Sequence, residues 1–175
     1  MAKFNNKYRI ASARLKNWDY SNRGVYYITI CTANRECFFG TVTNDEMIYS
    51  EIGQIVEKEW IKTLEIRPDM NLELGEFVVM PNHFHGVLFI GNNEYNSIND
   101  HNENINEFGP QSKNLSSIIR GFKSAVTVQA KRINPDFGWQ ARFYDHIIRN
   151  PQSYDVISKY IIDNPKKWID DEFNK

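Results

Sequence analysis

The chain of 175 residues has few of the features that would place a protein in a membrane or an oxidising compartment. No apolar run approaches the roughly 20 residues that span a bilayer, and the first residues lack the apolar core of a secretory signal peptide. Cys31 and Cys37 are the only cysteines, too few for a disulfide framework or a cysteine-based zinc site. We therefore expect a cytoplasmic protein without membrane contact, in which both thiols serve packing.

Net charge is also nearly absent, at −1, which taken alone argues against a nucleic-acid-binding protein. The charges are unevenly distributed, however. Residues 1–36 and residues 113–149 each carry seven Lys or Arg against two Asp or Glu, a balance of +5 for each segment. Such an asymmetry can place a basic face on a neutral protein; an ordinary solvated surface is the alternative explanation.

One domain is expected over residues 1–175, because the chain is too short for two well-packed domains. Its composition, 41% hydrophobic and 14% aromatic, is typical of a globular protein. Residues 92–112 are rich in Asn, Asp and Glu and can bury little apolar surface. This segment is predicted to be a mobile loop, because burial there cannot offset the entropy of ordering it.

Periodicity predicts an α+β fold. Segments rich in β-branched and aromatic residues predict strands, and apolar residues at helical spacing predict helices. The expected strands are 25–32, 72–80, 83–90 and 138–149, with a small hairpin over 37–50. The expected helices are 51–64, 115–133 and a last one that Asn150-Pro151 opens and Pro165 ends. The order is the βαββαβ of a ferredoxin-like antiparallel sheet, followed by an additional C-terminal helix.

The stretch Phe77–Ile90 contains the first candidate site. Two apolar runs surround a Pro-Asn turn, and the second run opens with His83 and His85. Side chains two apart on a strand share a face, so both imidazoles should project together, with Phe84 on the opposite face. Neutral imidazole nitrogens suit first-row divalent ions. The pair is thus half of a candidate metal site; two hydrogen-bonded core histidines are the alternative.

The last helix contains the second candidate group. Tyr160 and Asn164 are four residues apart and therefore lie on one side of a helix. Taken alone, this pairing is typical of an ordinary structural helix. Two other tyrosines compete with Tyr160 as a reactive group: Tyr154 lies on the packing side of the same helix, and Tyr144 lies on a strand, where it would contact DNA or the core.

Taken together and in order, these segments resemble the single-tyrosine HUH transposases, and within them most closely the REP-associated tyrosine transposases. The resemblance covers most of the chain and is carried by the following stretches: Gly24–Thr32, Phe77–Ile90, Trp139-Gln140, Phe143–Asn150, and Tyr160–Pro165 with Trp168. His-hydrophobe-His alone is a short and common motif, whereas the ordered set is specific.

The resemblance implies a homodimeric enzyme that cuts and rejoins single-stranded, hairpin-containing DNA with a divalent cation, Mg²⁺ or Mn²⁺. By position, His83 and His85 match the two histidine ligands and Tyr160 matches the nucleophile, carried by the additional C-terminal helix. Asn164 matches a third ligand, which is Gln in some relatives. The implied reaction is nicking and strand transfer through a 5′-phosphotyrosine.

Basic grooves and aromatic faces hold single-stranded nucleic acid. The candidate DNA contacts are Arg14, Lys16, Arg120, Lys123, Arg142 and His146, the last as a phosphate contact or a neighbour of the site. Three alternatives stay open at this point. They are a replication initiator or relaxase-type nickase with the same HUH chemistry, a non-catalytic ferredoxin-like nucleic-acid-binding module, and a metallohydrolase that combines His-x-His with carboxylates.

Overall fold

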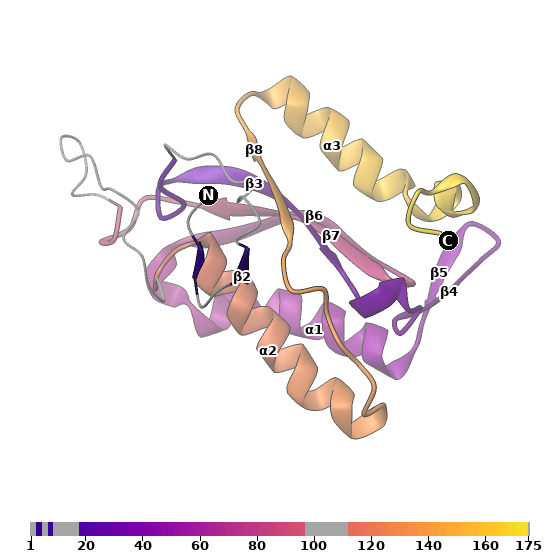
Figure 1. The fold of residues 1–175 in the computed structure, drawn as a ribbon. Coiled ribbons are helices and arrows are strands. Elements are labelled where there is room, and N and C mark those ends of the chain that lie inside the picture. The colour runs from indigo at the N-terminus through magenta and orange to yellow at the C-terminus, as the bar shows by residue number, and fades with distance from the viewer. Residues whose placement is uncertain (1–2, 5–6, 9–17, 97–111, 175) are drawn as a thin grey trace.

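A four-stranded antiparallel sheet forms the centre of the molecule, with its strands in the order β6-β7-β3-β8 (Figure 1). The computed structural model describes residues 18–96 and 112–174, together with the backbone of residues 3–4 and 7–8. The sheet strands are β3 (Gly24–Cys31), β6 (Leu72–Met80), β7 (His83–Ile90) and β8 (Tyr144–Ile148). Two small hairpins join β1 (Lys3–Phe4) to β2 (Lys7–Tyr8) and β4 (Gly40–Thr43) to β5 (Glu46–Tyr49).

Three α-helices cover the sheet: α1 (Glu51–Ile66), α2 (Leu115–Ile133) and α3 (Pro151–Asp163). Shorter 3₁₀ helices span Ala33–Arg35, Pro68–Met70 and Pro165–Asp170. Helices α1 and α2 lie on one side of the sheet and α3 lies on the other (Figure 1). The order β3-α1-β6-β7-α2-β8 confirms the ferredoxin-like βαββαβ fold, and α3 is the additional helix.

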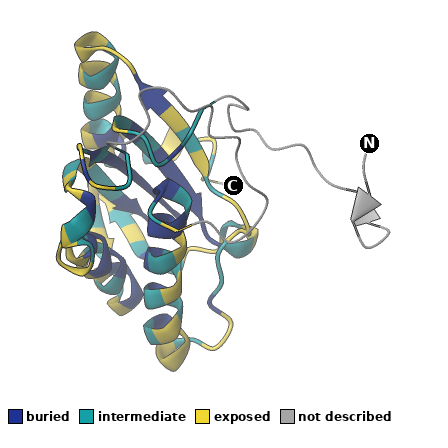
Figure 2. Cartoon of the chain, turned by 90° about the vertical axis from the view of Figure 1, so that its left-hand side faces the viewer, coloured by how far each residue is buried: buried dark blue, intermediate teal, exposed yellow. Residues whose placement is uncertain are grey.

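The principal core lies between the sheet and the pair α1 and α2. Figure 2 shows buried residues along the strands and exposed residues on the outer sides of the helices. Phe84 of β7 packs against Trp60 of α1 and Phe122 of α2, with ring centroids 4.7 and 5.5 Å away. Gly86, the next residue on that face, has no room for a side chain, because a Cβ there would lie 2.8 Å from the Phe84 ring.

β7 is a central strand buried on both faces, as its apolar sequence predicts. Phe84 and Leu88, two of its even-numbered residues, belong to the core under α1 and α2. Its odd-numbered residues face the other way, where Val87 packs with Ile148 and with Ile161 of α3. One strand therefore supplies a structural face and a second face toward the helix that carries Tyr160.

The expected strand at 138–149 needs correction, whereas the expected end of the last helix is confirmed. Regular strand pairing over 138–149 is limited to Tyr144–Ile148, because Trp139 makes only an isolated bridge to Thr32 and residues 140–143 lie outside the ladder. Helix α3 ends at Asp163, where the sequence predicts its end. Asn164 keeps helical angles (φ −58°, ψ −43°) and a 3₁₀ helix follows directly, with the proline at its first position.

Other expectations agree with the structure or lie outside it. The hairpin at 37–50 and the starts of all three helices are found, and α1 runs two residues past the expected end, to Ile66. Most of the predicted loop at 92–112 lies outside the described residues. In the part of the chain that is described, none of the helices combines the length and apolarity needed to cross a membrane.

Candidate active site

His83 and His85 lie side by side on the face of β7 that α3 covers, with ring centroids 4.6 Å apart. Both side chains are almost fully buried. Strand pairing holds them from both sides, since β3 and β6 flank β7 along its length. The imidazoles therefore project together, as the strand spacing predicts.

Asn82, in the turn before β7, sets the hydrogen-bonding state of His83. Its amide nitrogen donates to the backbone carbonyls of Arg35 and Phe173, at 3.1 and 2.7 Å. Its Oδ1 consequently faces Nδ1 of His83, at 2.9 Å. Because an amide oxygen only accepts, Nδ1 carries the proton. Burial lowers the pKa of His83 to about 3, so the ring is neutral at pH 7 and Nε2, which is buried without a hydrogen-bond partner, presents a lone pair.

His85 is held by β3. Its Nδ1 lies 2.8 Å from the hydroxyl of Tyr27 and 2.8 Å from that of Thr29, and the Tyr27 ring stacks on the imidazole at 5.5 Å. Burial, with a smaller contribution from His83, lowers the pKa of His85 well below its ordinary value. The second imidazole is therefore also neutral, with its Nε2 directed toward α3.

Helix α3 brings Tyr160 to this pair within one chain. The Tyr160 hydroxyl lies 3.5 Å from Nε2 of His85, and the two ring centroids are 5.3 Å apart. The neighbouring Ile161 is fully buried and anchors the helix, while Tyr160 keeps 38% of its surface exposed. The phenol is thus open to solvent and to a substrate. Tyr154, which also competed for the reactive role, packs on Phe89 at 5.7 Å.

Asn164 lies one turn beyond Tyr160 and is buried, yet neither its Oδ1 nor its Nδ2 has a hydrogen-bond partner. The side chain is near enough to raise the pKa of His83 and to lower that of Tyr160, without outweighing burial in either case. Burial raises the pKa of Tyr160, so the phenol is protonated at neutral pH until a reaction partner removes its proton.

The donor set fits a divalent cation. His83 and His85 are neutral, the form in which imidazole binds metal, and Nε2 of His83 and Oδ1 of Asn164 are buried acceptors without partners. Across residues 18–96 and 112–174, no three His, Cys, Asp or Glu side chains are grouped so as to hold a metal. A third protein ligand at this place would therefore be the Asn164 amide oxygen, a type that Mg²⁺ and Mn²⁺ accept.

The segment after α3 closes one side of the histidine pair. The Phe173 ring packs on His83, with centroids 4.5 Å apart. The Arg35 guanidinium lies 4.9 Å from the centre of the Phe173 ring and donates to the Glu172 carbonyl at 2.9 Å. Residues from the turn after β3 and from the end of the chain are thereby fastened beside β7.

Sequence reasoning missed four of these residues: Asn82, Tyr27, Thr29 and Phe173. A signal existed for two of them, because Tyr27 and Thr29 alternate on a strand that could have been paired with the histidine strand. Asn82 and Phe173 gave no local signal, since their contacts join segments far apart in the sequence.

The predicted DNA contacts are not gathered in one place. Arg120 and Lys123 lie on α2, in the helical layer across the sheet from the histidines. Arg120 lines a hollow of about 410 Å³ together with Arg67, Lys113 and three serines. Lys123 donates to the Gln140 carbonyl at 2.6 Å.

His146 lies in β8 opposite Tyr27, a neighbour of His85, and Arg142 lies two residues before β8. Both side chains are exposed. Arg14 and Lys16 lie outside the described residues. The DNA-binding role of all six residues stays a prediction.

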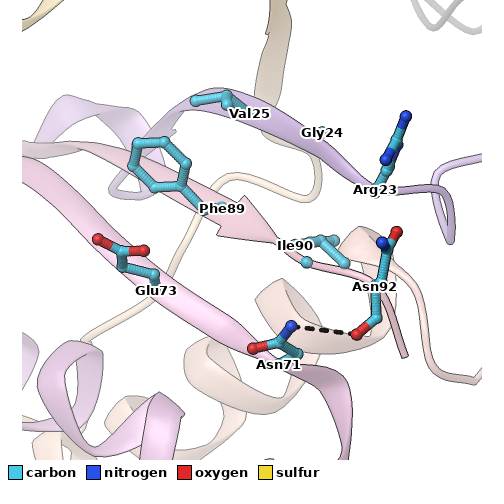
Figure 3. Close-up of a pocket in the computed structure, with 9 residues that line it drawn as sticks. Arg23, Gly24, Val25, Asn71, Glu73, Phe89, Ile90 and Asn92 are labelled. Carbon is cyan, nitrogen blue, oxygen red and sulfur yellow. Dashed lines mark hydrogen bonds between the residues drawn. The ribbon is translucent and has the colours of Figure 1, made fainter. Parts of the chain in front are cut away.

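A second hollow, of about 510 Å³, lies at the end of the sheet opposite the histidines. Figure 3 shows its wall of Phe89 and Val25, with Glu73 and Arg23 at the rim and Asn71 donating to the Asn92 carbonyl. None of the predicted site residues lines it.

Comparisons with known proteins agree with this architecture. No family model matches the chain. An uncharacterized protein of Haemophilus influenzae is 37% identical over 165 residues, which cover 92% of this chain and 91% of that protein. A solved structure of a REP-associated tyrosine transposase bound to a REP hairpin is similar with a TM-score of 0.56 and 20% identity, over 90% of this chain and 74% of that one. The chain therefore belongs to the family of the Haemophilus influenzae protein, and its fold is that of the REP-associated tyrosine transposase, which confirms the resemblance in its sequence.

Proposed function

We propose that the protein is a transposase that nicks single-stranded DNA and transfers the strand through a 5′-phosphotyrosine on Tyr160. The observation that carries this proposal is the 3.5 Å distance between the Tyr160 hydroxyl and Nε2 of His85, beside a second neutral imidazole and an unpaired amide. The transposase-like fold supports it. The REP hairpin bound in the similar structure supports hairpin-containing single-stranded DNA as the substrate.

Tyr160 supplies the nucleophile. Its oxygen attacks the phosphorus, the new phenol–phosphorus bond forms, and the bond to the 3′-oxygen breaks, which leaves a 3′-hydroxyl after protonation. The phenol proton passes to solvent, which reaches the half-exposed side chain. Because the ester retains the bond energy, another 3′-hydroxyl can reverse the step and join a different strand without ATP.

His83, His85 and Asn164 would hold Mg²⁺ or Mn²⁺. When bound, such an ion reduces the charge repulsion that protects a phosphodiester and orients the phosphorus. The surrounding residues hold the ligand atoms in place: Asn82 fixes the protonated nitrogen of His83, and Tyr27 and Thr29 position His85. This support from residues behind the ligands is typical of metal sites.

The test is the covalent product. Labelled single-stranded DNA from the flanks of the protein's own gene, mixed with the protein and Mn²⁺ or Mg²⁺, should give a protein–DNA adduct that survives a denaturing gel. Tyr160→Phe should bind the same DNA and give no adduct, and Tyr154→Phe is the matched control on the same helix. An adduct that persists in Tyr160→Phe would assign the nucleophile elsewhere, and no adduct with any metal would leave a non-catalytic binding module.

Metal binding can be read without activity. Mn²⁺ at 100 times its Kd should stabilise the fold by about 2.7 kcal/mol, since a ligand specific for the folded state adds RT ln(1 + [L]/Kd). The double variant His83→Ala/His85→Ala should lose this increment. A wild-type protein with no metal-dependent change in melting temperature would contradict the metal site.

We further propose a homodimer and a cytoplasmic setting. Cys31 and Cys37 both carry free thiols, which supports a reducing compartment. Sedimentation at several protein concentrations tests the dimer, and a monomer at all of them would refute it.

A further inference from the structure

Part of the sheet face beside the candidate active site is left open by α3. Helix α3 packs mainly against β6 and less against β7 and β8, and β8 forms one edge of the sheet. In the pairing of β3 with β8, Tyr144 lies opposite Thr29 and His146 lies opposite Tyr27. Residues directly opposite each other share a face, so Tyr144 and His146 lie on the same face as the candidate site.

A row of rings leads from this open edge to Tyr160. Tyr144 meets Tyr27 edge to face at 6.3 Å, Tyr27 stacks on His85 at 5.5 Å, and His85 meets Tyr160 at 5.3 Å. At the outer end Tyr144 keeps 56% of its surface exposed, and the His146 side chain is also exposed. In the middle of the row His85 is buried and Tyr27 is half-buried, whereas Tyr144 and Tyr160 at its two ends are open to a ligand.

The chemistry of this edge matches single-stranded DNA. Unpaired bases stack on exposed aromatic rings whatever their sequence, and phosphates are drawn to cationic side chains. Arg142 lies just before β8 and Arg149 just after it, and both are exposed. β8 thus carries aromatic faces and has a guanidinium group at either end, which is the composition of a groove that binds single-stranded DNA.

We propose that Tyr144 and His146 form a stacking surface for an unpaired base of the strand whose phosphate reaches Tyr160. The inference rests on the proposed function for its ligand, single-stranded DNA. In this inference, β8 holds the DNA strand near the histidines. This role is distinct from those of the proposed nucleophile and metal ligands.

The experiment measures binding by fluorescence anisotropy in EDTA, so that no reaction occurs. The probes are a short labelled strand of mixed sequence and an abasic strand of the same length, which keeps the phosphates and lacks the bases. Tyr144→Ala should weaken binding of the mixed-sequence strand by roughly tenfold, in line with the loss of one base stack, and leave the abasic strand unaffected. Tyr144→Phe should bind as wild type does. Val128→Ala, an equally exposed position on α2, is the matched control.

Equal affinity of Tyr144→Ala and wild type for the mixed-sequence strand would overturn the inference. So would an equal loss on both strands, which would indicate a charge or folding effect. If Tyr144→Ala instead changes only the sedimentation of the protein, this edge joins two copies of the chain, and the inference also fails. The proposed function is judged separately, by the wild-type adduct on the denaturing gel.

Discussion

The two faces of the sheet are built on different principles. Under α1 and α2, one continuous core contains large rings such as Trp60, Phe84 and Phe122. Under α3, the buried aliphatic cluster consists of Val87, Ile148 and Ile161. Next to that small cluster lie the buried polar side chains of His83, His85 and Asn164. A core built for stability alone would avoid such groups.

This contrast indicates how one strand, β7, supplies both the structural core and the residues of the proposed site. Alternate residues of a strand face opposite ways, so Phe84 and Leu88 belong to the core while His83 and His85 line the site. A substitution at an even-numbered position should change stability, and a substitution at a site residue should change chemistry. Four predictions test this separation, in decreasing order of expected effect.

The largest effect on stability should come from the helical face. Phe84→Ala removes a ring that contacts Trp60 and Phe122, and the cavity should cost about 3–5 kcal/mol of unfolding free energy. Tyr160→Phe, on the other face, should change it by less than about 0.5 kcal/mol. Urea denaturation measures both variants, and similar losses would show that the two faces are not separate.

Acid should destabilise the metal-free protein through the site. His83 ordinarily titrates at 6.5, and burial lowers its pKa to about 3, so below pH 6.5 the unfolded chain takes up a proton that the folded chain does not. The stabilisation is complete above that pH and falls as pH drops toward 3. Between pH 6.5 and about pH 4 the loss from His83 should be about 3 kcal/mol, with His85 acting in the same direction.

Urea denaturation in EDTA at several pH values measures this loss, with His83→Gln as the comparison. Carboxylates titrate in both proteins and cancel in the difference. Parallel pH profiles for wild type and His83→Gln would contradict a neutral, buried His83.

Overpacking of the structural face should have an intermediate effect. An added methyl at Gly86 would lie 2.8 Å from the Phe84 ring and 3.1 Å from Trp60, so Gly86→Ala should cost about 2 kcal/mol. Adding Phe84→Leu should recover part of that loss by making room. Thermal denaturation tests this, with Gly138→Ala as the milder control, since its nearest contact is 3.3 Å. No recovery in the double variant would indicate another source of strain.

Matched changes at two helix N-termini should have the smallest effect. Asn114 caps α2 and Asn150 caps α3, each accepting a backbone N–H, and Ala at either position should cost about 1 kcal/mol. In Asn114→Ala, hydrogen exchange should show reduced amide protection across the whole molecule, because α2 belongs to the main core. In Asn150→Ala, the reduced amide protection should be confined to α3. A global loss in both would mean that α3 is as firmly integrated as α2.

Much of the fold could be predicted because local patterns agreed with tertiary structure. The apolar run from His83 to Ile90 and the Asn150-Pro151 signal identified their elements to the residue. The i, i+2 spacing placed both imidazoles on one face of their strand. The i, i+4 spacing placed Tyr160 and Asn164 on one side of the last helix.

The rest depends on tertiary contacts that spacing does not encode. The orientation of the Asn82 amide is fixed by hydrogen bonds to two carbonyls that lie far from it in sequence, those of Arg35 and Phe173. The alternation of Tyr27 and Thr29 placed both on one face of their strand, but the strand register was needed to show that His85 shares that face. The 3₁₀ helix after Pro165 could not be predicted from spacing; its Trp168 and the following Phe173 lie beside His83, with ring centroids 6.0 and 4.5 Å from the imidazole.

The approach of Tyr160 to His85 within a single chain has a kinetic consequence. A nucleophile and ligands that come from one polypeptide are already at a fixed effective concentration, so dilution does not separate them. On the proposed function, and with DNA at a saturating concentration, the yield of cut strand per protein molecule should therefore stay constant as the protein is diluted, even where a dimer would fall apart.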